Sequence, residues 1–300
     1  VVLPTADQKS GACKATFLLL VLTAERKNMN SFMSWVGGKK NLRDEVLARF
    51  PPYYERYIEV FGGAGWVLFH KPPGADFEVY NDFNSNLANL YRCVRDKPAK
   101  LKYKLRYVLD SREDFEYLAI LHKRGILPRL YDVDRAAKFY QLIRYSYASG
   151  LDSFGSQPHS MWSDFPMIDL AARRLQKVVI ENKDFEKLIK QYDRPVSFFY
   201  CDPPYFATEN YYKDVGFTAK DHIRLRDTLL EIKGKFLVSY NDCPEIREIW
   251  DKPNIHIEEI SRLNNLAQRY DAGCQYGELL ISNYDTSERA KAIKQLSLFD

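Results

Sequence analysis

The sequence of 300 residues predicts an α/β fold, with a doubly wound sheet and a mostly helical insert. Strand-like apolar runs alternate with segments of helical periodicity, which is the pattern of such a sheet. One run, residues 57–61, passes into a glycine-rich turn, and another, residues 198–201, ends in Asp-Pro-Pro-Tyr at 202–205. Between them lies a basic and aromatic stretch, residues 86–165, which we interpret as the insert.

The composition fits a folded chain of this size. Apolar residues make up 46% of the sequence and charged residues 28%, which suffices for a sizeable core and argues against wholesale disorder. The net charge of +4 neither requires nor excludes a nucleic-acid partner, because the distribution of charge matters more than its sum. Five scattered cysteines without a Cys-x-x-Cys pair favour a reducing compartment and argue against a structural zinc site.

The first residues are expected to lie outside the folded core. The apolar run at residues 15–24 is too short to span a bilayer and only weakly similar to a signal-peptide core. Methionines at 29 and 33 come just ahead of the first motif. We therefore interpret residues 1–31 as an extension, and we expect a cytoplasmic protein with no membrane partner.

The first motif is Trp-Val-Gly-Gly-Lys at residues 35–39, ahead of a predicted helix at 41–47. Paired glycines let the backbone approach a ligand closely. Trp35 would supply an aromatic wall and Lys39 a cation. A solvated lysine after a flexible turn is the alternative interpretation of this motif alone.

The glycine turn at residues 62–65 joins the strand at 57–61 to a helix that starts at Trp66. Such a turn binds a nucleotide in the first unit of a doubly wound sheet. Leu68 replaces the third glycine of the dinucleotide fingerprint and no Gly-Lys-Ser/Thr is present, so a single-nucleoside cofactor is favoured. The next strand, 77–82, ends in Asp82, which is suited to binding ribose hydroxyls or, alternatively, to capping a helix.

The stretch at residues 86–165 combines basic and aromatic side chains. One predicted helical region carries seven basic residues against the single acid Asp96, which suggests phosphate contacts or a solvated helix face. Residues 139–147 interleave aromatics with Arg144, which suits gripping DNA and filling the gap left by an extruded base. The seven basic residues are Arg92, Arg95, Lys97, Lys100, Lys102, Lys104 and Arg106.

After this stretch the sequence returns to alternating strands and helices. Residues 207–217 are polar and aromatic, and we interpret them as a mobile loop over a site. Helices are predicted at residues 169–177, 183–191 and 219–233, and strands at 178–180, 198–201, 236–242 and 277–284.

The Asp-Pro-Pro-Tyr sequence at 202–205 is the strongest chemical signal. The prolines end the strand in a stiff turn, so a carboxylate and an aromatic ring stand together at its end. Asp202 and the Pro203 carbonyl can accept hydrogen bonds from the exocyclic amine of a base, on whose face Tyr205 can stack. This interpretation requires the glycine turn to open on the same side of the molecule. In isolation, an ordinary turn with a solvated Asp202 is the alternative.

The motifs at 35–39, 61–65, 81–82 and 202–205 together resemble those of the Dam-like (D12 class) DNA adenine-N6 methyltransferases. The similarity runs from Phe32 to Tyr284. It implies a Rossmann-like, S-adenosylmethionine-dependent methyltransferase sheet with an inserted, mostly helical target-recognition domain. The implied parts are a catalytic domain at 32–85 and 166–285, the insert at 86–165 and a tail at 286–300.

The resemblance also implies the reaction and its residues. S-adenosylmethionine would donate a methyl group to the N6 amine of an adenine flipped out of double-stranded DNA, without a metal. The implied catalytic residues are Asp202, Pro203 and Tyr205. The implied cofactor contacts are Trp35, Lys39, Phe61, Gly63, Gly65, Asp82 and Asp202, and DNA contacts are expected at Lys100, Lys102, Lys104, Arg144 and Tyr145.

Three alternatives stay open at this point. The substrate would be adenine of RNA, or the N4 amine of cytosine, although cytosine enzymes more often have Ser ahead of Pro-Pro-Tyr. A non-catalytic DNA-binding module on the same fold is the third alternative, and the intact Asp202 and Tyr205 argue against it.

The tail carries a separate signal, Gln-Leu-Ser-Leu-Phe at residues 295–299. It is similar to the short peptide by which bacterial replication and repair proteins bind the sliding clamp. The charged tether at 286–294 would present its glutamine and apolar anchors to a hydrophobic pocket. A frayed helix end packed on the domain is the alternative. The residues in question are Gln295, Leu296, Leu298 and Phe299.

Overall fold

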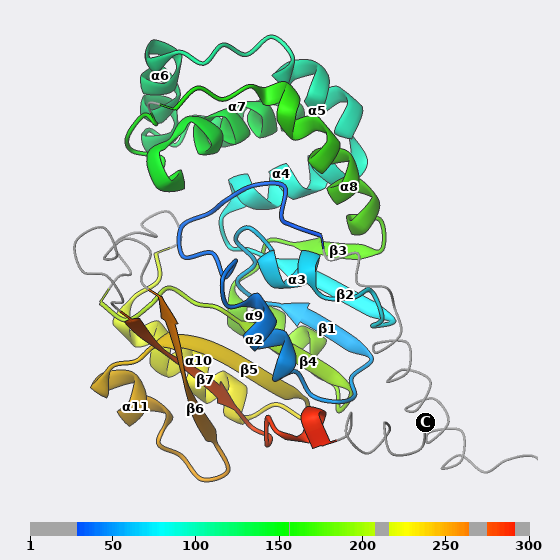
Figure 1. Cartoon of the computed structure of the whole chain (residues 1–300), viewed down its shortest axis with the longest axis vertical. Coiled ribbons are helices and arrows are strands. Elements are labelled where there is room, and N and C mark those ends of the chain that lie inside the picture. The colour runs from blue at the N-terminus through cyan, green and yellow to red at the C-terminus, as the bar shows by residue number, and fades with distance from the viewer. Residues whose placement is uncertain (1–28, 156, 208–215, 264–274, 292–300) are drawn as a thin grey trace, which may run out of the picture.

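The computed structural model describes residues 29–155, 157–207, 216–263 and 275–291. At its centre is a seven-stranded sheet with the order β3-β2-β1-β4-β5-β7-β6 (Figure 1). Strands β1 to β5 run parallel to one another, and β7 is antiparallel to β5 and β6, so the predicted α/β fold is confirmed. The strands are β1 (Arg56–Glu59), β2 (Phe77–Asn81), β3 (Val178–Glu181), β4 (Ser197–Cys201), β5 (Lys235–Asn241), β6 (His256–Leu263) and β7 (Gln275–Ser282).

The central strands are buried on both faces, as their apolar and aromatic runs predict. Along β4, Phe198 and Tyr200 join one core while Phe199 and Cys201 join the other, because side chains alternate along a strand. The first core lies under α2 (Arg43–Ala48), α3 (Trp66–His70) and α4 (Ser85–Asp96), and the second under α9 (Phe185–Tyr192), α10 (Ala219–Leu230) and α11 (Pro244–Trp250).

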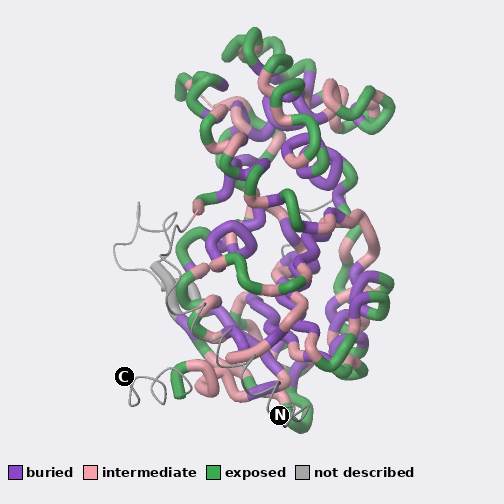
Figure 2. Tube along the Cα trace, turned by 90° about the vertical axis from the view of Figure 1, so that its right-hand side faces the viewer, coloured by how far each residue is buried: buried purple, intermediate pink, exposed green. Residues whose placement is uncertain are grey.

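Between β2 and β3 the chain forms a group of helices at one end of the molecule (Figure 1). Their apolar side chains belong to the same core as the first layer of the sheet, and buried residues run from the sheet into the helices (Figure 2). After α4 come α5 (Pro98–Leu105), α6 (Arg112–Lys123), α7 (Asp132–Tyr145) and α8 (Phe165–Leu175), with 3-10 turns η1 (Leu127–Arg129), η2 (Tyr147–Ser149) and η3 (Met161–Asp164).

Several element predictions need correction. The basic region expected to form one helix is two, because α5 begins at Pro98 and a proline is tolerated in the first turn of a helix but not in its interior. Four elements were not individually predicted: α6 buries only a short apolar face, α7 was noted only for its aromatic and basic residues, α11 is brief, and β6 has adjacent acids in place of an apolar run. The helix expected at 169–177 starts earlier, at Phe165.

Some predictions lie outside the described residues: the extension at 1–28, most of the loop at 207–217 and the tail from 292 onward. Within the described part of the chain, no helix has the length and apolar content needed to span a membrane. In the same residues, no group of three His, Cys, Asp or Glu side chains is arranged to hold a metal ion.

Candidate active site at the switch point of the sheet

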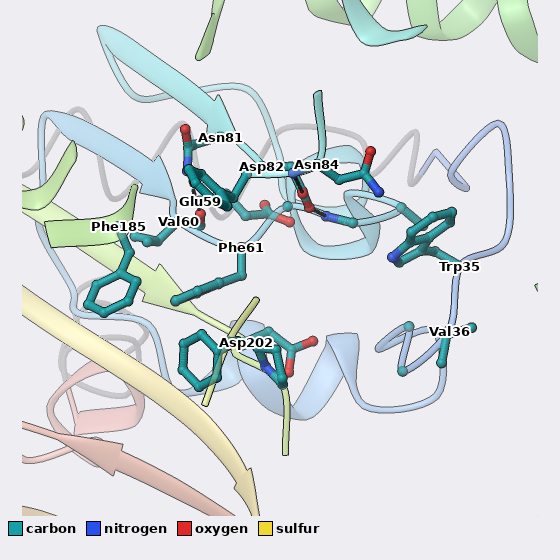
Figure 3. A pocket seen from close by; sticks show the side chains of 18 of the residues that line it. Trp35, Val36, Glu59, Val60, Phe61, Asn81, Asp82, Asn84, Phe185 and Asp202 are labelled. Atoms are coloured by element: carbon teal, nitrogen blue, oxygen red, sulfur yellow. Dashed lines mark hydrogen bonds between the residues drawn. The ribbon is translucent and has the colours of Figure 1, made fainter. Parts of the chain in front are cut away.

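The candidate site lies where the strand order reverses, between β1 and β4. The chain leaves these neighbouring parallel strands in opposite directions, which opens a crevice at their carboxyl ends. A cavity of about 1010 Å³ occupies this place. The glycine turn and the Asp-Pro-Pro-Tyr turn therefore open into the same cavity. Its lining includes Trp35, Lys39, Phe61, Gly63, Asp82 and Asp202 (Figure 3).

The glycine turn after β1 packs against a pair of tyrosines. Gly63 and Gly65 have φ angles of +49° and +64°, which glycine adopts without steric cost. The Tyr80 hydroxyl donates a hydrogen bond to the Gly63 carbonyl at 2.7 Å, and its ring stacks on Tyr91 with centroids 3.8 Å apart. A Cβ on Gly62 would lie 2.2 Å from the Tyr80 ring, so this approach also requires glycine.

Asp82 closes the glycine turn from the end of β2. Its Oδ2 accepts a hydrogen bond from the Gly63 amide at 2.9 Å, and its Oδ1 accepts one from the Asn84 amide at 2.7 Å. Burial raises the pKa of Asp82 to about 6, and the two backbone hydrogen bonds offset part of that effect. The carboxylate faces the cavity, while both of its oxygens also order the surrounding backbone.

Glu59, the last residue of β1, also lines the cavity, and the sequence analysis did not identify it. Its side chain is buried, and its Oε2 accepts a hydrogen bond from the Tyr57 hydroxyl at 2.7 Å. Burial raises the pKa of Glu59 to about 8. The signal in the sequence was an acid at the end of an apolar strand, three residues before the first glycine of the turn.

A second group that the sequence analysis missed lines the cavity beside β3. Asp184 caps α9 by accepting hydrogen bonds from two backbone amides, and its Oδ2 lies 2.9 Å from Nη2 of Arg224. The Arg224 guanidinium stands 4.0 Å from the centroid of the Phe185 ring. These contacts hold an aromatic ring at the edge of the cavity.

Asp202 stands at the carboxyl end of β4 with its Oδ1 held from two sides. Nζ of Lys39 lies 2.6 Å from this oxygen, and the Ser239 hydroxyl on β5 donates to it at 3.0 Å. Burial raises the pKa of Asp202, and the adjacent Lys39 ammonium offsets only part of that rise. Lys39, expected as a cofactor contact, is thus a direct partner of the expected catalytic acid.

The rest of the Asp-Pro-Pro-Tyr motif surrounds this acid. Among the described residues, Asp202 and Pro204 of the motif line the cavity, while Pro203 and Tyr205 are not among its lining residues. The Tyr205 hydroxyl accepts a hydrogen bond from Lys39 and donates one to Oε2 of Glu278 at 2.5 Å. The tyrosine is therefore tied to the sheet through its hydroxyl.

The residues expected to bind DNA are placed less favourably. Lys102 lies 2.6 Å from Asp169, and Lys104 lies 2.8 Å from Asp134, so both ammonium groups have carboxylate partners within the chain. Lys100 is exposed on α5.

The two expected DNA contacts on α7 differ from each other. The Arg144 guanidinium pairs with Asp164 at 2.9 Å and also contacts His159. Tyr145 is 3% exposed and belongs to the core, because the face of α7 on which it lies packs inward. It is not available to a DNA partner in this conformation.

The doubly wound sheet with a reversed β7, and a glycine turn that shares its cavity with an Asp-Pro-Pro-Tyr acid, agree with the methyltransferase class that the motifs resemble. Residues 35–265 match the family described as D12 class N6 adenine-specific DNA methyltransferase. The chain belongs to this family of adenine-specific DNA-methylating enzymes.

Individual relatives are similar over most of their length. The Type II methyltransferase M1.LlaDCHI of Lactococcus lactis subsp. cremoris is 29% identical over 286 residues, covering 88% of this chain and 99% of the relative. The DNA adenine methylase of Escherichia coli (strain K12) is 26% identical over 255 residues, covering 79% of this chain and 89% of the relative. The DNA adenine methylase of Haemophilus influenzae is 27% identical over 243 residues, covering 73% of this chain and 82% of the relative.

Proposed function

We propose that the cavity binds S-adenosylmethionine together with an adenine extruded from double-stranded DNA, and that Asp202 receives the N6 amine. One observation carries the proposal: the glycine turn and Asp202 lie at the ends of adjacent strands and open into one cavity. Its volume of about 1010 Å³ leaves room for a nucleoside cofactor and a base side by side.

The glycine turn supports the cofactor assignment. Glycine is required at Gly62, where a Cβ would displace the Tyr80 ring, and it is favoured at Gly63 and Gly65, where φ is positive. Because these residues have no side chain, the backbone of the turn can lie close to a bound nucleoside. The residues that hold the cofactor are Trp35, Phe61, Gly63 and Asp82, all of which line the cavity, while Gly65 shapes the turn. When bound, S-adenosylmethionine supplies a methyl group on a positively charged sulfur.

Asp202 orients and polarises the target amine. Its two contacts from Lys39 and Ser239 are both made to Oδ1, so Oδ2 is the oxygen that accepts a hydrogen bond from N6. The Pro203 carbonyl accepts the second one, and the Tyr205 ring stacks on the base. A fixed acceptor pair of this kind favours the geometry needed for attack and stabilises the charge that develops on the amine.

The chemistry is tested by incubating the protein with methyl-labelled S-adenosylmethionine and double-stranded DNA, RNA or no nucleic acid. Digestion to nucleosides should place the label on N6-methyladenine from DNA. Label on RNA adenine, or on N4 of cytosine, would overturn the proposed substrate.

Extrusion of the adenine needs a separate measurement. Once the methylated sites are mapped, 2-aminopurine at the target position should gain fluorescence when the protein and S-adenosylmethionine are added, because the base leaves the stack. The same probe one position away serves as the control. Equal signals at the two positions would contradict flipping of the target base.

We also propose that the tail binds the bacterial sliding clamp through Gln295, Leu296, Leu298 and Phe299. The described part of the tether supports an anchored start: Thr286 donates to Glu258 at 2.9 Å, and Glu288 lies 3.2 Å from Lys235. The chain that continues from there carries a glutamine and an apolar anchor pair, the chemistry that fills a small hydrophobic pocket.

The clamp partner is tested with purified sliding clamp and two versions of the chain, one intact and one lacking residues 295–300. Binding should be lost with the deletion and with Leu298→Ala plus Phe299→Ala. Ser297→Ala, between the anchors, should bind as the intact chain does. Equal binding of the deleted and intact chains would refute this partner.

A further inference from the structure

A buried carboxylate on β7 reaches the Asp-Pro-Pro-Tyr site from outside the cavity lining. Glu278 is fully buried, and β7 places it opposite Asn241 on β5. Its Oε2 accepts a hydrogen bond from the Tyr205 hydroxyl at 2.5 Å and lies 3.8 Å from Nζ of Lys39. The Lys39 ammonium also stands 4.4 Å from the centroid of the Tyr205 ring.

Glu278 differs from its neighbours on β7. Leu279, Leu280 and Ile281 follow it directly, all buried and apolar. Burying a carboxylate costs several kcal/mol unless hydrogen bonds and opposite charge compensate, and an apolar residue of similar size is often at least as stable. Tyr205 and Lys39, which compensate the Glu278 carboxylate, both belong to the catalytic cluster. The carboxylate is therefore linked to that cluster as well as to the sheet.

The contacts form one chain from β7 to the reacting group. Glu278 holds the Tyr205 hydroxyl, Lys39 donates to that hydroxyl, and the same ammonium holds Oδ1 of Asp202. Ser239 holds the same oxygen from β5. With Oδ1 occupied by these two donors, the direction of Oδ2 depends on where Lys39 is held.

We propose that Glu278 is a positioning residue for methyl transfer, which holds Lys39 and Tyr205 so that Asp202 presents Oδ2 to the target amine. The inference rests on the proposed function of Asp202 as acceptor for N6. Glu278 itself touches neither substrate. Its carboxylate sets the geometry of Tyr205, which stacks on the base, and of Lys39, which holds Asp202.

The test compares Glu278→Gln and Glu278→Ala with the wild-type protein in the methyl-transfer assay. Glu278→Gln keeps the shape and an acceptor for Tyr205 but removes the charge that attracts Lys39, so kcat should fall about tenfold. Glu278→Ala removes both and should approach the roughly 10²-fold loss of a misplaced catalytic group. KM for S-adenosylmethionine should stay near the wild-type value, because Glu278 does not line the cavity.

A pH profile separates positioning from mere loss of stability. The negative charge of Glu278 contributes to the raised pKa of Asp202, so Glu278→Gln should move the acidic limb of kcat to lower pH. The other groups that face Asp202 are Lys39, Ser239, Tyr200, Cys201, Tyr205 and Glu59, and none of them is substituted in the variant.

Glu78 provides the matched control. It is a buried carboxylate on β2 paired with Lys71 and, at 2.6 Å, with Arg174, outside the cavity lining. Glu78→Gln should lower Tm while leaving kcat and its pH profile unchanged. Should Glu278→Gln fail to fold, Tyr205→Phe takes its place, since it keeps the ring and removes the hydroxyl between Lys39 and Glu278.

The outcomes separate the inference from the proposed function. If Asp202→Ala is inactive while folded Glu278→Gln has wild-type kcat and an unmoved acidic limb, the positioning role is refuted and the proposed function stands. If Asp202→Ala retains wild-type transfer, the proposed function itself fails. A Glu278→Gln variant that lowers kcat and shifts the acidic limb, with KM retained, supports the positioning role.

Discussion

Nζ of Lys39 lies 2.6 Å from Oδ1 of Asp202, although 163 residues separate them in the chain. The side chains are 5% and 18% exposed, so the pair is largely shielded from water. Removing one member of such a pair leaves an uncompensated charge, which costs about 3–5 kcal/mol. The first motif of the chain and the tip of β4 thus form one electrostatic unit, and Asp202, the proposed catalytic acid, is held at a single oxygen.

Asp202→Ala should abolish methyl transfer while leaving DNA binding intact. The variant removes the acceptor that fixes the amine, and losing one such group costs at least about 10² in kcat. Transfer of labelled methyl groups and DNA affinity are measured on the same preparation. Asp242→Ala is the control, because Asp242 follows β5 and pairs with Arg247 outside the cavity lining. Substantial transfer by Asp202→Ala would count against its role.

Asp82→Ala should mainly weaken binding of S-adenosylmethionine. Its carboxylate faces the cavity and also orders the Gly63 amide, and hydrogen bonds to charged groups contribute about 1.5–3 kcal/mol. The expected loss is therefore about 10- to 100-fold in affinity. Titration calorimetry with the cofactor provides the measurement, and an unchanged affinity would contradict the role given to Asp82.

Glu59→Gln should stabilise the protein at high pH relative to the wild type. The folded pKa of about 8 lies above the ordinary value of 4.5. Glu59 therefore contributes stability that is fully present below pH 4.5 and lost as the pH rises through 8. A glutamine cannot ionise, so the stability of the variant relative to the wild type should increase from pH 5 to pH 9. The expected increase in the free energy of unfolding is on the order of a few kcal/mol, and it is followed as a growing difference in Tm. A difference that stays flat with pH would exclude a protonated Glu59 at neutral pH.

Gly62→Ala should lower both stability and cofactor affinity. The new Cβ would lie 2.2 Å from the Tyr80 ring, and overpacking of this kind costs about 1–3 kcal/mol. Displacing Tyr80 also disturbs its hydrogen bond to the Gly63 carbonyl. Gly234→Ala is the control. Its Cβ would lie 2.5 Å from the Ser197 carbonyl oxygen, and Gly234 does not line the cavity, so this variant should lower Tm without changing cofactor affinity. Equal cofactor affinity in the two variants would show that the turn tolerates the methyl group.

Replacing Lys100, Lys102 and Lys104 with alanine should flatten the salt dependence of DNA binding only slightly. Losing three phosphate contacts would change the slope of log K against log salt concentration by nearly three, but Lys102 and Lys104 already have carboxylate partners. We expect a change of about one at most, from Lys100. Lys190→Ala, which removes an ion-paired lysine of α9, is the control. A change near three would show that DNA displaces both carboxylates.

The sequence by itself determined the central strands and the two turns that face the cavity. These features are local: β4 is an apolar run from Phe198 to Cys201, β1 leads directly into the glycine turn, glycines permit positive φ at 63 and 65, and two prolines end β4 at Asp202. The carboxyl ends of neighbouring parallel strands lie at the same edge of a sheet. The reactive side chains that follow these strands therefore predicted a shared site. The order and spacing of the motifs then pointed to the family.

Only the tertiary structure decided the partners of these groups. Lys39 on Asp202, Ser239 on the same oxygen and Glu278 on Tyr205 are contacts between distant parts of the chain, and no local pattern encodes them. The same holds for Lys102 and Lys104 of α5, whose carboxylate partners lie on α8 and α7. Residue type and spacing indicate which chemistry a side chain is capable of. Tertiary packing determines which groups that side chain contacts and how far it is shielded from water.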